Sequence, residues 1–322
     1  MDKLRAAFET PHPLTVGVEE ELMLLDAETL DLAPRAPEVL AALGGDPRFK
    51  LEMPAAHIEI VLPPLGSAAE VAAALLAARR DLARACSSLG LRPAGAGVHP
   101  FAAPLGELNS APRYDSMLAE FGDVARSQLV CALQVHVAVR PAERAMAVYN
   151  ALRPFLPLLG ALAANGPIHE GRDTGLASAR PPICELLPQQ GLPPELTWES
   201  YAERMTDPAR WWWELRPHPV HGTLEVRVPD TQATVEEAAA VVAVVHALVA
   251  TLAEGESPRA PASPGETPSG DLVDRPPADL EADRRAAYAH GASGPFVPRL
   301  HAVLDAIAPA AERLGTSAQL AS

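Results

Sequence analysis

The sequence predicts an α+β fold in which helices pack against one face of a mainly antiparallel sheet. Four segments alternate apolar and polar side chains with the period of two residues that is typical of a strand buried on one face. Two long apolar segments follow helix-capping sequences and predict helices that cover this face. The four strand segments are residues 15–25, 57–61, 133–139 and 223–228.

Each predicted strand has an apolar side and a polar side. In the first strand, Glu19 and Glu21 share the polar side, whereas Glu20 lies on the opposite side with apolar residues. The polar sides of the other strands carry His57 and Glu59, Gln134 and His136, and Thr223, Glu225 and Arg227. If the apolar sides pack on helices, the polar sides meet on one concave surface.

Capping-box spacings mark the beginnings of two helices. Ser67 precedes Glu70 by three residues ahead of an Ala- and Leu-rich segment, and Thr234 precedes Glu237 in the same way. The apolar run over 238–253 is shorter than the roughly 20 residues that span a bilayer, so we interpret it as a buried core helix. A third helix is expected over 141–164, broken or kinked by its prolines.

The composition changes sharply over residues 255–277, which are rich in Pro, Gly, Ser and acidic residues. Such a segment has too few large apolar side chains to fold alone. We therefore expect a main domain over residues 1–254, a flexible loop or linker over 255–277, and a C-terminal helical element over 278–322. Helices over about 278–290 and 298–314 would pack this element on the main domain.

Charge and cysteine usage exclude several classes of protein. The formal net charge of −15 argues against a nucleic acid or an anionic membrane as the main partner. The three cysteines, Cys86, Cys131 and Cys184, form no CxxC pair, which argues against a disulfide framework or a structural zinc site. No signal peptide is recognisable at the N-terminus, and we expect a cytoplasmic protein.

The converging polar faces predict a metal site. Carboxylates that share a pocket raise one another's pKa unless a cation compensates them. Oxygen ligands with one imidazole suit Mg²⁺ or Mn²⁺ better than zinc. The alternative is that these residues are solvated faces of ordinary strands, which is the better interpretation for any single strand. The same pattern on four strands favours a site composed of Glu19, Glu21, Glu59, His136, Glu225 and Arg227, with Glu52 close by.

Two further segments carry candidate ligand-binding residues. Residues 171–180 combine two glycines with Arg172, Thr174, Ser178 and Arg180, a composition that suits an anionic substrate but is also that of a surface loop. The consecutive tryptophans at 211–213 are interpreted as core residues, and Arg216 after them could face the pocket.

Taken in order, the motifs resemble those of the carboxylate–amine ligase family, also called the type 2 glutamate–cysteine ligases. The resemblance covers roughly residues 14–253, and the order and spacing of the motifs carry it. They are the Gly17–Glu21 segment, the pair Glu52 and Glu59, the segment 134–137, the loop 171–180, the segment 212–216 and the segment 222–230.

This resemblance implies a glutamine-synthetase-like fold whose antiparallel sheet forms an active-site funnel. It also implies ATP as a substrate, Mg²⁺ or Mn²⁺, and amide-bond formation through an acyl phosphate. Glutamate–cysteine ligation is one candidate reaction, and ligation of glutamate or another amino acid to a different amine is another. A homodimer is a family-level expectation.

The resemblance also implies roles for individual residues. The implied metal ligands are Glu19, Glu21, Glu52, Glu59, His136 and Glu225. Arg227 is implied as a phosphate contact and Arg172 and Arg180 as substrate or phosphate anchors, all three being catalytic candidates. Substrate or ATP contacts are expected from these arginines and from Gln134, Thr174, Ser178 and Arg216.

Three departures from the family pattern affect the presumed substrate pocket. Gln134 stands where relatives often carry a histidine, the segment between Glu195 and Trp211 is short, and residues 164–167 replace a serine-rich stretch. Two other functions remain open from the residues alone. One is phosphate transfer to a guanidino or carboxylate group without amide formation, and the other is a non-catalytic module that binds metal and nucleotide.

Overall fold

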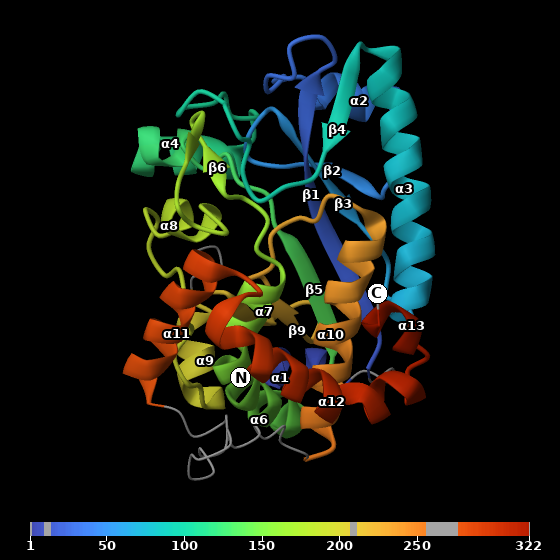
Figure 1. The fold of residues 1–322 in the computed structure, drawn as a ribbon, viewed down its shortest axis with the longest axis vertical. Helices are drawn as coiled ribbons and strands as arrows, with labels where there is room; N and C mark the ends of the chain where they lie inside the picture. The colour runs from blue at the N-terminus through green and yellow to red at the C-terminus, as the bar shows by residue number, and fades with distance from the viewer. Residues whose placement is uncertain (1, 10–13, 207–210, 256–275, 322) are drawn as a thin grey trace.

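The computed structural model describes residues 2–9, 14–206, 211–255 and 276–321. Its centre is a seven-stranded sheet in the order β2-β3-β1-β5-β9-β8, with β4 also pairing with β1 (Figure 1). Every pair in this sheet is antiparallel, which confirms the predicted fold class. The strands are β1 (Val16–Asp26), β2 (Phe49–Leu51), β3 (His57–Val61), β4 (Leu91–Ala94), β5 (Leu133–Ala138), β8 (Leu215–His218) and β9 (Thr223–Val226).

The register of the sheet determines which polar side chains are neighbours. Glu21 on β1 lies opposite Glu59 on β3, and Glu19 lies opposite Gln134 on β5. On the next pair, His136 of β5 faces Glu225 of β9. Because directly opposed residues point to the same face of a sheet, the four polar strand faces form one continuous surface. The predicted convergence is therefore present.

Helices cover the apolar face of the sheet, and further helices surround its polar face. They are α1 (Asp2–Ala7), α2 (Ala36–Ala42), α3 (Ala68–Ser88), α4 (Pro112–Phe121), α5 (Asp123–Arg126), α6 (Ala142–Leu152), η1 (Arg153–Phe155), α7 (Leu156–Leu162), α8 (Arg180–Cys184), α9 (Trp198–Arg204), α10 (Val235–Ala253), α11 (Pro277–His290), η4 (Gly294–Phe296), α12 (Val297–Arg313) and α13 (Ser317–Leu320). Of these, α2, α3, α6 and α10 contact the sheet directly. A small separate sheet joins β6 (Ile168–His169) to β7 (Arg172–Asp173).

The capping sequences begin their helices where expected. The side chain of Thr234 accepts a hydrogen bond from the backbone of Glu237, and Glu237 caps Thr234 in return. Ser67 accepts from the backbone of Glu70 at the start of α3. The expected helix over 141–164 is divided into α6, η1 and α7, with Pro154 in η1 and Pro157 in the first turn of α7, where a missing backbone donor is tolerated.

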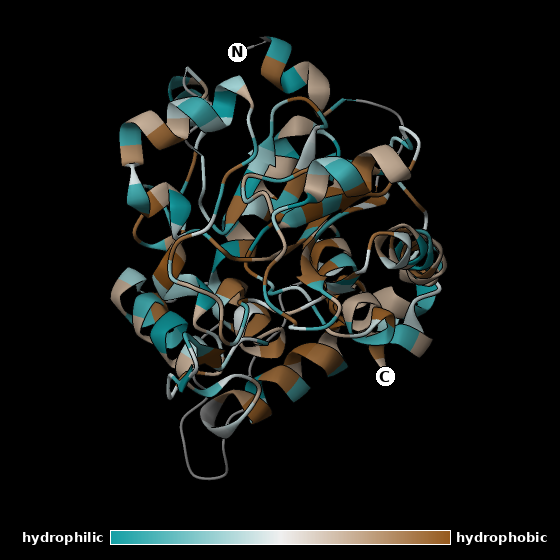
Figure 2. Ribbon diagram, turned by 90° about the horizontal axis from the view of Figure 1, so that it is seen from above, coloured by the Kyte–Doolittle hydropathy of each residue, from teal (hydrophilic) through white to brown (hydrophobic). Residues whose placement is uncertain are grey.

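The core lies between the sheet and these helices. Val16, Val18, Leu22 and Leu24 on the back of β1 are all at most 2% exposed. Figure 2 shows the hydrophobic segments gathered in the interior, with hydrophilic segments on the outer helices. Two helical stretches, 142–162 and α10, are long and apolar enough to cross a membrane, but 72% and 78% of them are buried within the protein. This burial agrees with the predicted core helix.

A buried ion pair ties the back of the sheet to its helical cover. Glu20 is fully buried and accepts hydrogen bonds from Nε and Nη2 of Arg79 on α3 at 2.8 and 2.7 Å. The same guanidinium donates to the carbonyls of Gln232 and Ala233, just before α10. Glu20 therefore points away from its two glutamate neighbours, as the strand alternation predicted.

The C-terminal helices pack on the main body, α11 against α7 and α12 against α10. They match the helices expected over 278–290 and 298–314. The linker predicted over 255–277 lies almost wholly in residues 256–275, outside the described residues, and Pro277 already belongs to α11. The division into domains stays a prediction.

Candidate active site

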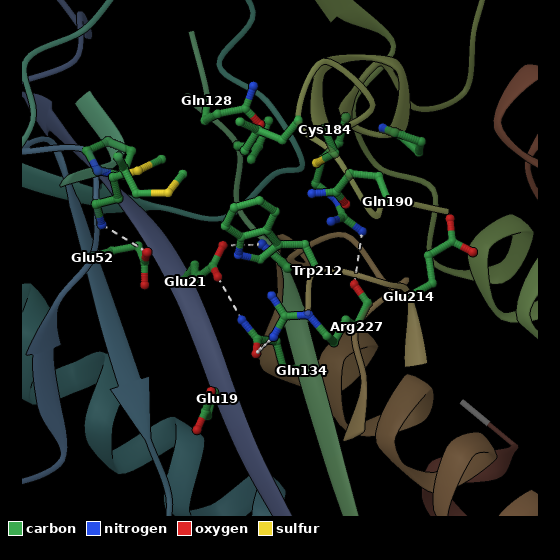
Figure 3. A pocket seen from close by; sticks show the side chains of 18 of the residues that line it. Glu19, Glu21, Glu52, Gln128, Gln134, Cys184, Gln190, Trp212, Glu214 and Arg227 are labelled. Carbon is green, nitrogen blue, oxygen red and sulfur yellow. Dashed lines mark hydrogen bonds between the residues drawn. The ribbon is translucent and has the colours of Figure 1, made fainter. Parts of the chain in front are cut away.

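A cavity of about 730 Å³ opens on the polar face of the sheet. Its floor is made by β1, β3 and β5 with Arg227 just after β9, and its walls by α4, α8, the segment before β8 and Arg216 of β8. Figure 3 shows part of this lining. The charged and amide residues that line it are Glu19, Glu21, Glu52, Glu59, Arg113, Glu120, Gln128, Gln134, Arg180, Gln190, Glu214, Arg216, Arg227 and Arg284.

Four glutamates on the strands β1 and β3 and after β2 form a carboxylate wall, defined here as Glu19, Glu21, Glu52 and Glu59. Burial and the neighbouring Glu52 raise the pKa of Glu21 to about 7. Burial also raises the pKa of Glu52, and burial with the charges of Glu52 and Glu19 raises that of Glu59 well above its ordinary value. Burial and mutual repulsion therefore disfavour the ionised form of these three carboxyls in the absence of a cation.

The pKa of Glu225 is shifted in the opposite direction from the raised pKa values in the carboxylate wall. Glu225 is fully buried, and its two oxygens accept hydrogen bonds from Arg227 and Arg216. Burial alone would raise its pKa, but the two guanidiniums outweigh burial and hold the pKa well below the ordinary value. Glu225 is therefore ionised in the folded protein and fixes both arginines at the edge of the cavity.

Glu19, His136 and Glu225 could hold a metal ion together, because one ligand atom from each lies within 4.8 Å of the others. Nδ1 of His136 lies 3.0 Å from the Thr223 hydroxyl, and Nε2 lies 3.7 Å from Oε1 of Glu19. Nε2 is buried without a hydrogen-bond partner in the described part of the chain. Burial lowers the pKa of His136 and favours the neutral ring that a metal requires. The donor set of carboxylates with one imidazole fits Mg²⁺ or Mn²⁺.

Gln134 joins the carboxylate wall to the arginines. Its Nε2 donates to Oε1 of Glu21 at 2.8 Å, and its Oε1 accepts from Nη1 of Arg227 at 2.7 Å (Figure 3). The other oxygen of Glu21 accepts from the backbone N–H of Ala132 at 2.7 Å. The amide at position 134 therefore links a glutamate of the carboxylate wall to Arg227.

The residues of the loop 171–180 lie in two different places, one in the cavity wall and one outside it. Arg180 is buried in the cavity wall, where its Nε donates to Asp230 at 2.6 Å and its Nη2 to the carbonyl of Val228. Arg172 is exposed on β7, and Thr174 bonds to the carbonyl of Pro167. Neither lines the cavity, because the β6–β7 hairpin carries them away from it. Ser178 is buried but also lies outside the cavity lining.

The expected grouping of Arg172, Thr174 and Ser178 with Arg180 is therefore not what the structure shows. The first residues of this segment form the second strand of the β6–β7 hairpin, which begins at Ile168, and the spacing of polar residues gives no sign of that hairpin. Their roles as substrate contacts stay predictions.

The consecutive tryptophans at 211–213 do not share one environment. Trp211 is 2% exposed and donates to the carbonyl of Leu215, as the core interpretation predicted. Trp212 instead lines the cavity (Figure 3). Its ring makes an edge contact with Phe121 at the end of α4, with ring centres 6.0 Å apart. The sequence analysis also missed Arg113, Glu214 and Arg284, whose helical or loop positions show no strand alternation.

Comparison with known proteins decides the family. The family model described as glutamate-cysteine ligase family 2 matches residues 15–290. The chain belongs to glutamate–cysteine ligase family 2. As a family member it is an ATP-dependent carbon–nitrogen ligase, in agreement with the resemblance found from the motifs.

Relatives from bacteria support this membership. A protein of Rubrobacter xylanophilus named "Putative glutamate–cysteine ligase 2-3" is 41% identical over 268 residues, which cover 79% of this chain and 74% of that protein. A protein of Salinispora arenicola named "Putative glutamate–cysteine ligase 2" is 37% identical over 254 residues, covering 74% of this chain and 67% of the relative.

Solved structures confirm the fold. The glutamate–cysteine ligase of Francisella tularensis in complex with AMP aligns with a TM-score of 0.62 at 12% identity, covering 95% of this chain and 81% of that one. A bifunctional glutathione synthetase from Pasteurella multocida aligns with a TM-score of 0.61 at 13% identity, and this chain spans 46% of its length. The glutamine-synthetase-like ligase fold implied by the motifs is confirmed.

Proposed function

We propose that this protein joins a carboxylic acid to an amine through an acyl phosphate formed from ATP. The observation that carries the proposal is the arrangement of the cavity. The carboxylate wall lies on one side, and the guanidiniums of Arg227 and Arg180 reach the same space from the other side. This arrangement can neutralise a triphosphate and orient a carboxylate beside it.

The carboxylate wall together with His136 and Glu225 would hold Mg²⁺ or Mn²⁺. When bound, the metal neutralises phosphate charge and orients the phosphate oxygens. The raised pKa values of Glu21 and Glu59 and the unpartnered Nε2 of His136 support this assignment. Glu225 is already paired with two arginines, so it is the proposed ligand with the least free capacity.

The proposed reaction has two steps. First, an oxygen of the substrate carboxylate attacks the γ-phosphorus of ATP, the bond to the β-phosphate oxygen breaks, and ADP leaves. Second, the amine attacks the acyl carbon, and phosphate leaves with the oxygen that came from the carboxylate. The amine loses protons as the amide forms. In this chain, Arg227 is placed to stabilise the charge in transfer, because Gln134 and Glu225 fix its guanidinium.

Glutamate as the acid and cysteine as the amine form one candidate substrate pair, suggested by the names of the relatives. Ligation of glutamate or another amino acid to a different amine is the other. A cytoplasmic homodimer that uses Mg²⁺ completes the proposal.

The test is ADP release by the purified full-length protein with amino acids supplied in pairs, in Mg²⁺ and separately in Mn²⁺. We expect release only when an acid and an amine are both present, and loss of release in the E19A and E225A variants. A stable phosphorylated product that needs no amine would favour phosphate transfer instead. Tight ATP binding without turnover on any pair would favour a non-catalytic binding module.

A further inference from the structure

Helix α11 contributes an arginine to the wall of the cavity. Arg284 is 4% exposed and lines the cavity beside Gln190, Gly191 and Glu214. This helix follows the undescribed residues 256–275 and is far in sequence from the strands that make the cavity floor. The C-terminal part of the chain is therefore part of the cavity wall.

The guanidinium of Arg284 connects two acidic residues from separate segments. Its Nε donates to Oε1 of Glu214 at 2.6 Å, and its Nη1 donates to Oε1 of Glu185 at 2.5 Å. Glu185 follows α8, and Glu214 immediately precedes β8. The ring of Tyr288 lies under the guanidinium at 5.0 Å, and its hydroxyl donates to the same oxygen of Glu185 at 3.0 Å. The planar guanidinium donates to both glutamates at once because its Nε and Nη1 are separate donors in one rigid group.

The same guanidinium packs on the backbone of a glycine. Gly191 has a φ of +81°, and a Cβ at this position would lie 3.0 Å from Cζ of Arg284. The carbonyl of Gly191 accepts from the backbone N–H of Glu214 at 3.0 Å, and the carbonyl of Glu214 accepts from the backbone N–H of Arg227 at 2.8 Å. Arg284 therefore fixes the turn at 190–191 and the start of β8, on either side of Trp212.

We propose that Arg284 is a positioning residue for the amine acceptor. This inference rests on the proposed function. The phosphate of an acyl phosphate would lie against the carboxylate wall, so the amine must approach the acyl carbon from the opposite side of the cavity. That side is the wall that Arg284 holds together, with Cys184, Gln190 and Trp212 facing the cavity. Arg284 itself is occupied by Glu185 and Glu214 and acts through the segments that carry them.

The segment that Arg284 holds is joined to Arg227 by a backbone hydrogen bond from Arg227 to Glu214, but among the described residues the side chain of Arg284 does not itself hydrogen-bond to the strands that carry the chemistry. None of the hydrogen bonds of Arg284 reaches β1, β3, β5 or β9 in the described part of the chain. Loss of Arg284 should therefore shift the acceptor-binding wall and leave ATP binding in place. A shift of about 1 Å in a substrate-positioning group can reduce the rate by roughly a hundredfold.

The test separates a positioning role from a role in folding. R284M alone leaves buried Glu214 without its partner, so the informative variant is R284M combined with E214Q, compared with E214Q alone. R284K tests conservative rescue, since lysine can pair with Glu214 but lacks the planar fork. R285M is the matched control, because Arg285 is the next residue on α11, is 74% exposed and pairs only with Glu281 in the described structure.

We expect the KM for the acceptor to rise about tenfold or more in R284M/E214Q relative to E214Q. The KM for ATP should stay within about twofold of its value in E214Q. The acceptor KM of R284K should lie between those of E214Q and R284M/E214Q, and that of R285M should match the unmodified protein. The inference is overturned if the acceptor KM is unchanged, if the KM for ATP rises equally, or if R285M has the same effect. Absence of ADP release by the unmodified protein on every pair contradicts the proposed function itself, and the two failures are thus distinguished.

Discussion

Gln134 holds Glu21 in place: its Nε2 lies 2.8 Å from Oε1 of the carboxylate, and the hydrogen bond joins two adjacent strands. The other end of the amide accepts from Arg227. One neutral side chain therefore orients both a proposed metal ligand and a proposed phosphate contact. Groups that orient metal ligands commonly affect metal affinity by about 10- to 100-fold when removed.

The first prediction concerns this amide. Gln134→Met should weaken Mn²⁺ binding about tenfold, because Oε1 of Glu21 loses its donor and Arg227 loses its acceptor. Titration calorimetry with Mn²⁺ measures the change. Gln190→Met is the matched control, as Gln190 lines the same cavity but makes no described contact with the carboxylate wall. Equal Mn²⁺ affinity in Gln134→Met and the unmodified protein would contradict the assignment.

The second prediction separates two adjacent glutamates. Glu21→Gln should abolish ADP release while the fold survives, because a neutral amide replaces a carboxyl whose ionised form is disfavoured by burial. Glu20→Gln should keep the chemistry but lower the free energy of unfolding by about 3 kcal/mol, because Arg79 loses a buried partner. Urea unfolding and ADP release, measured on both variants, should show opposite patterns. Loss of activity without loss of stability in Glu20→Gln would contradict the prediction.

The third prediction concerns pH. The pKa of Glu21 is raised to about 7, so without metal the carboxyl is protonated below that pH and ionised above it. A metal requires the ionised form, so Mn²⁺ affinity should fall as the pH decreases below about 7 and level off above it. Binding at pH 6 should release protons, which calorimetry in buffers of different ionisation enthalpy measures. Affinity that is independent of pH between 6 and 8 would exclude Glu21 as a ligand.

The fourth prediction concerns Arg227. Arg227→Lys keeps the charge but replaces the planar guanidinium, whose Nη1 donates to both Gln134 and Glu225, by a compact and more flexible ammonium group. We expect kcat to fall about a hundredfold or more, since preorganised donors contribute this much to charge stabilisation. The KM for the acceptor should change little. Arg113→Lys, at the exposed rim of the same cavity, serves as the control and should retain most of its activity.

Strand alternation was sufficient to predict the floor of the site. Glu19, Glu21, Glu59, Gln134 and Glu225 lie on one face because side chains alternate with a fixed period, and the helices on the other face follow from the apolar sides. The capping boxes gave the starts of α3 and α10 for the same local reason.

The walls of the cavity could not be predicted in this way. Trp212 and Trp211 are adjacent and chemically identical, yet one lines the cavity and the other is in the core, because the turn before β8 decides their direction. Arg172 and Arg180 separate because Arg172 lies on the β6–β7 hairpin, whereas Arg180 begins α8. Arg284 reaches the cavity only through the packing of α11, a contact between distant segments that no local pattern records.

The central claim is that a substrate carboxylate attacks ATP to form an acyl phosphate. The most direct measurement uses an acid substrate labelled with ¹⁸O in the reacting carboxylate, with mass analysis of the phosphate released. The account predicts one ¹⁸O atom in each phosphate for each amide formed, since the carboxylate oxygen leaves with the phosphorus. Unlabelled phosphate released together with the amide would contradict it.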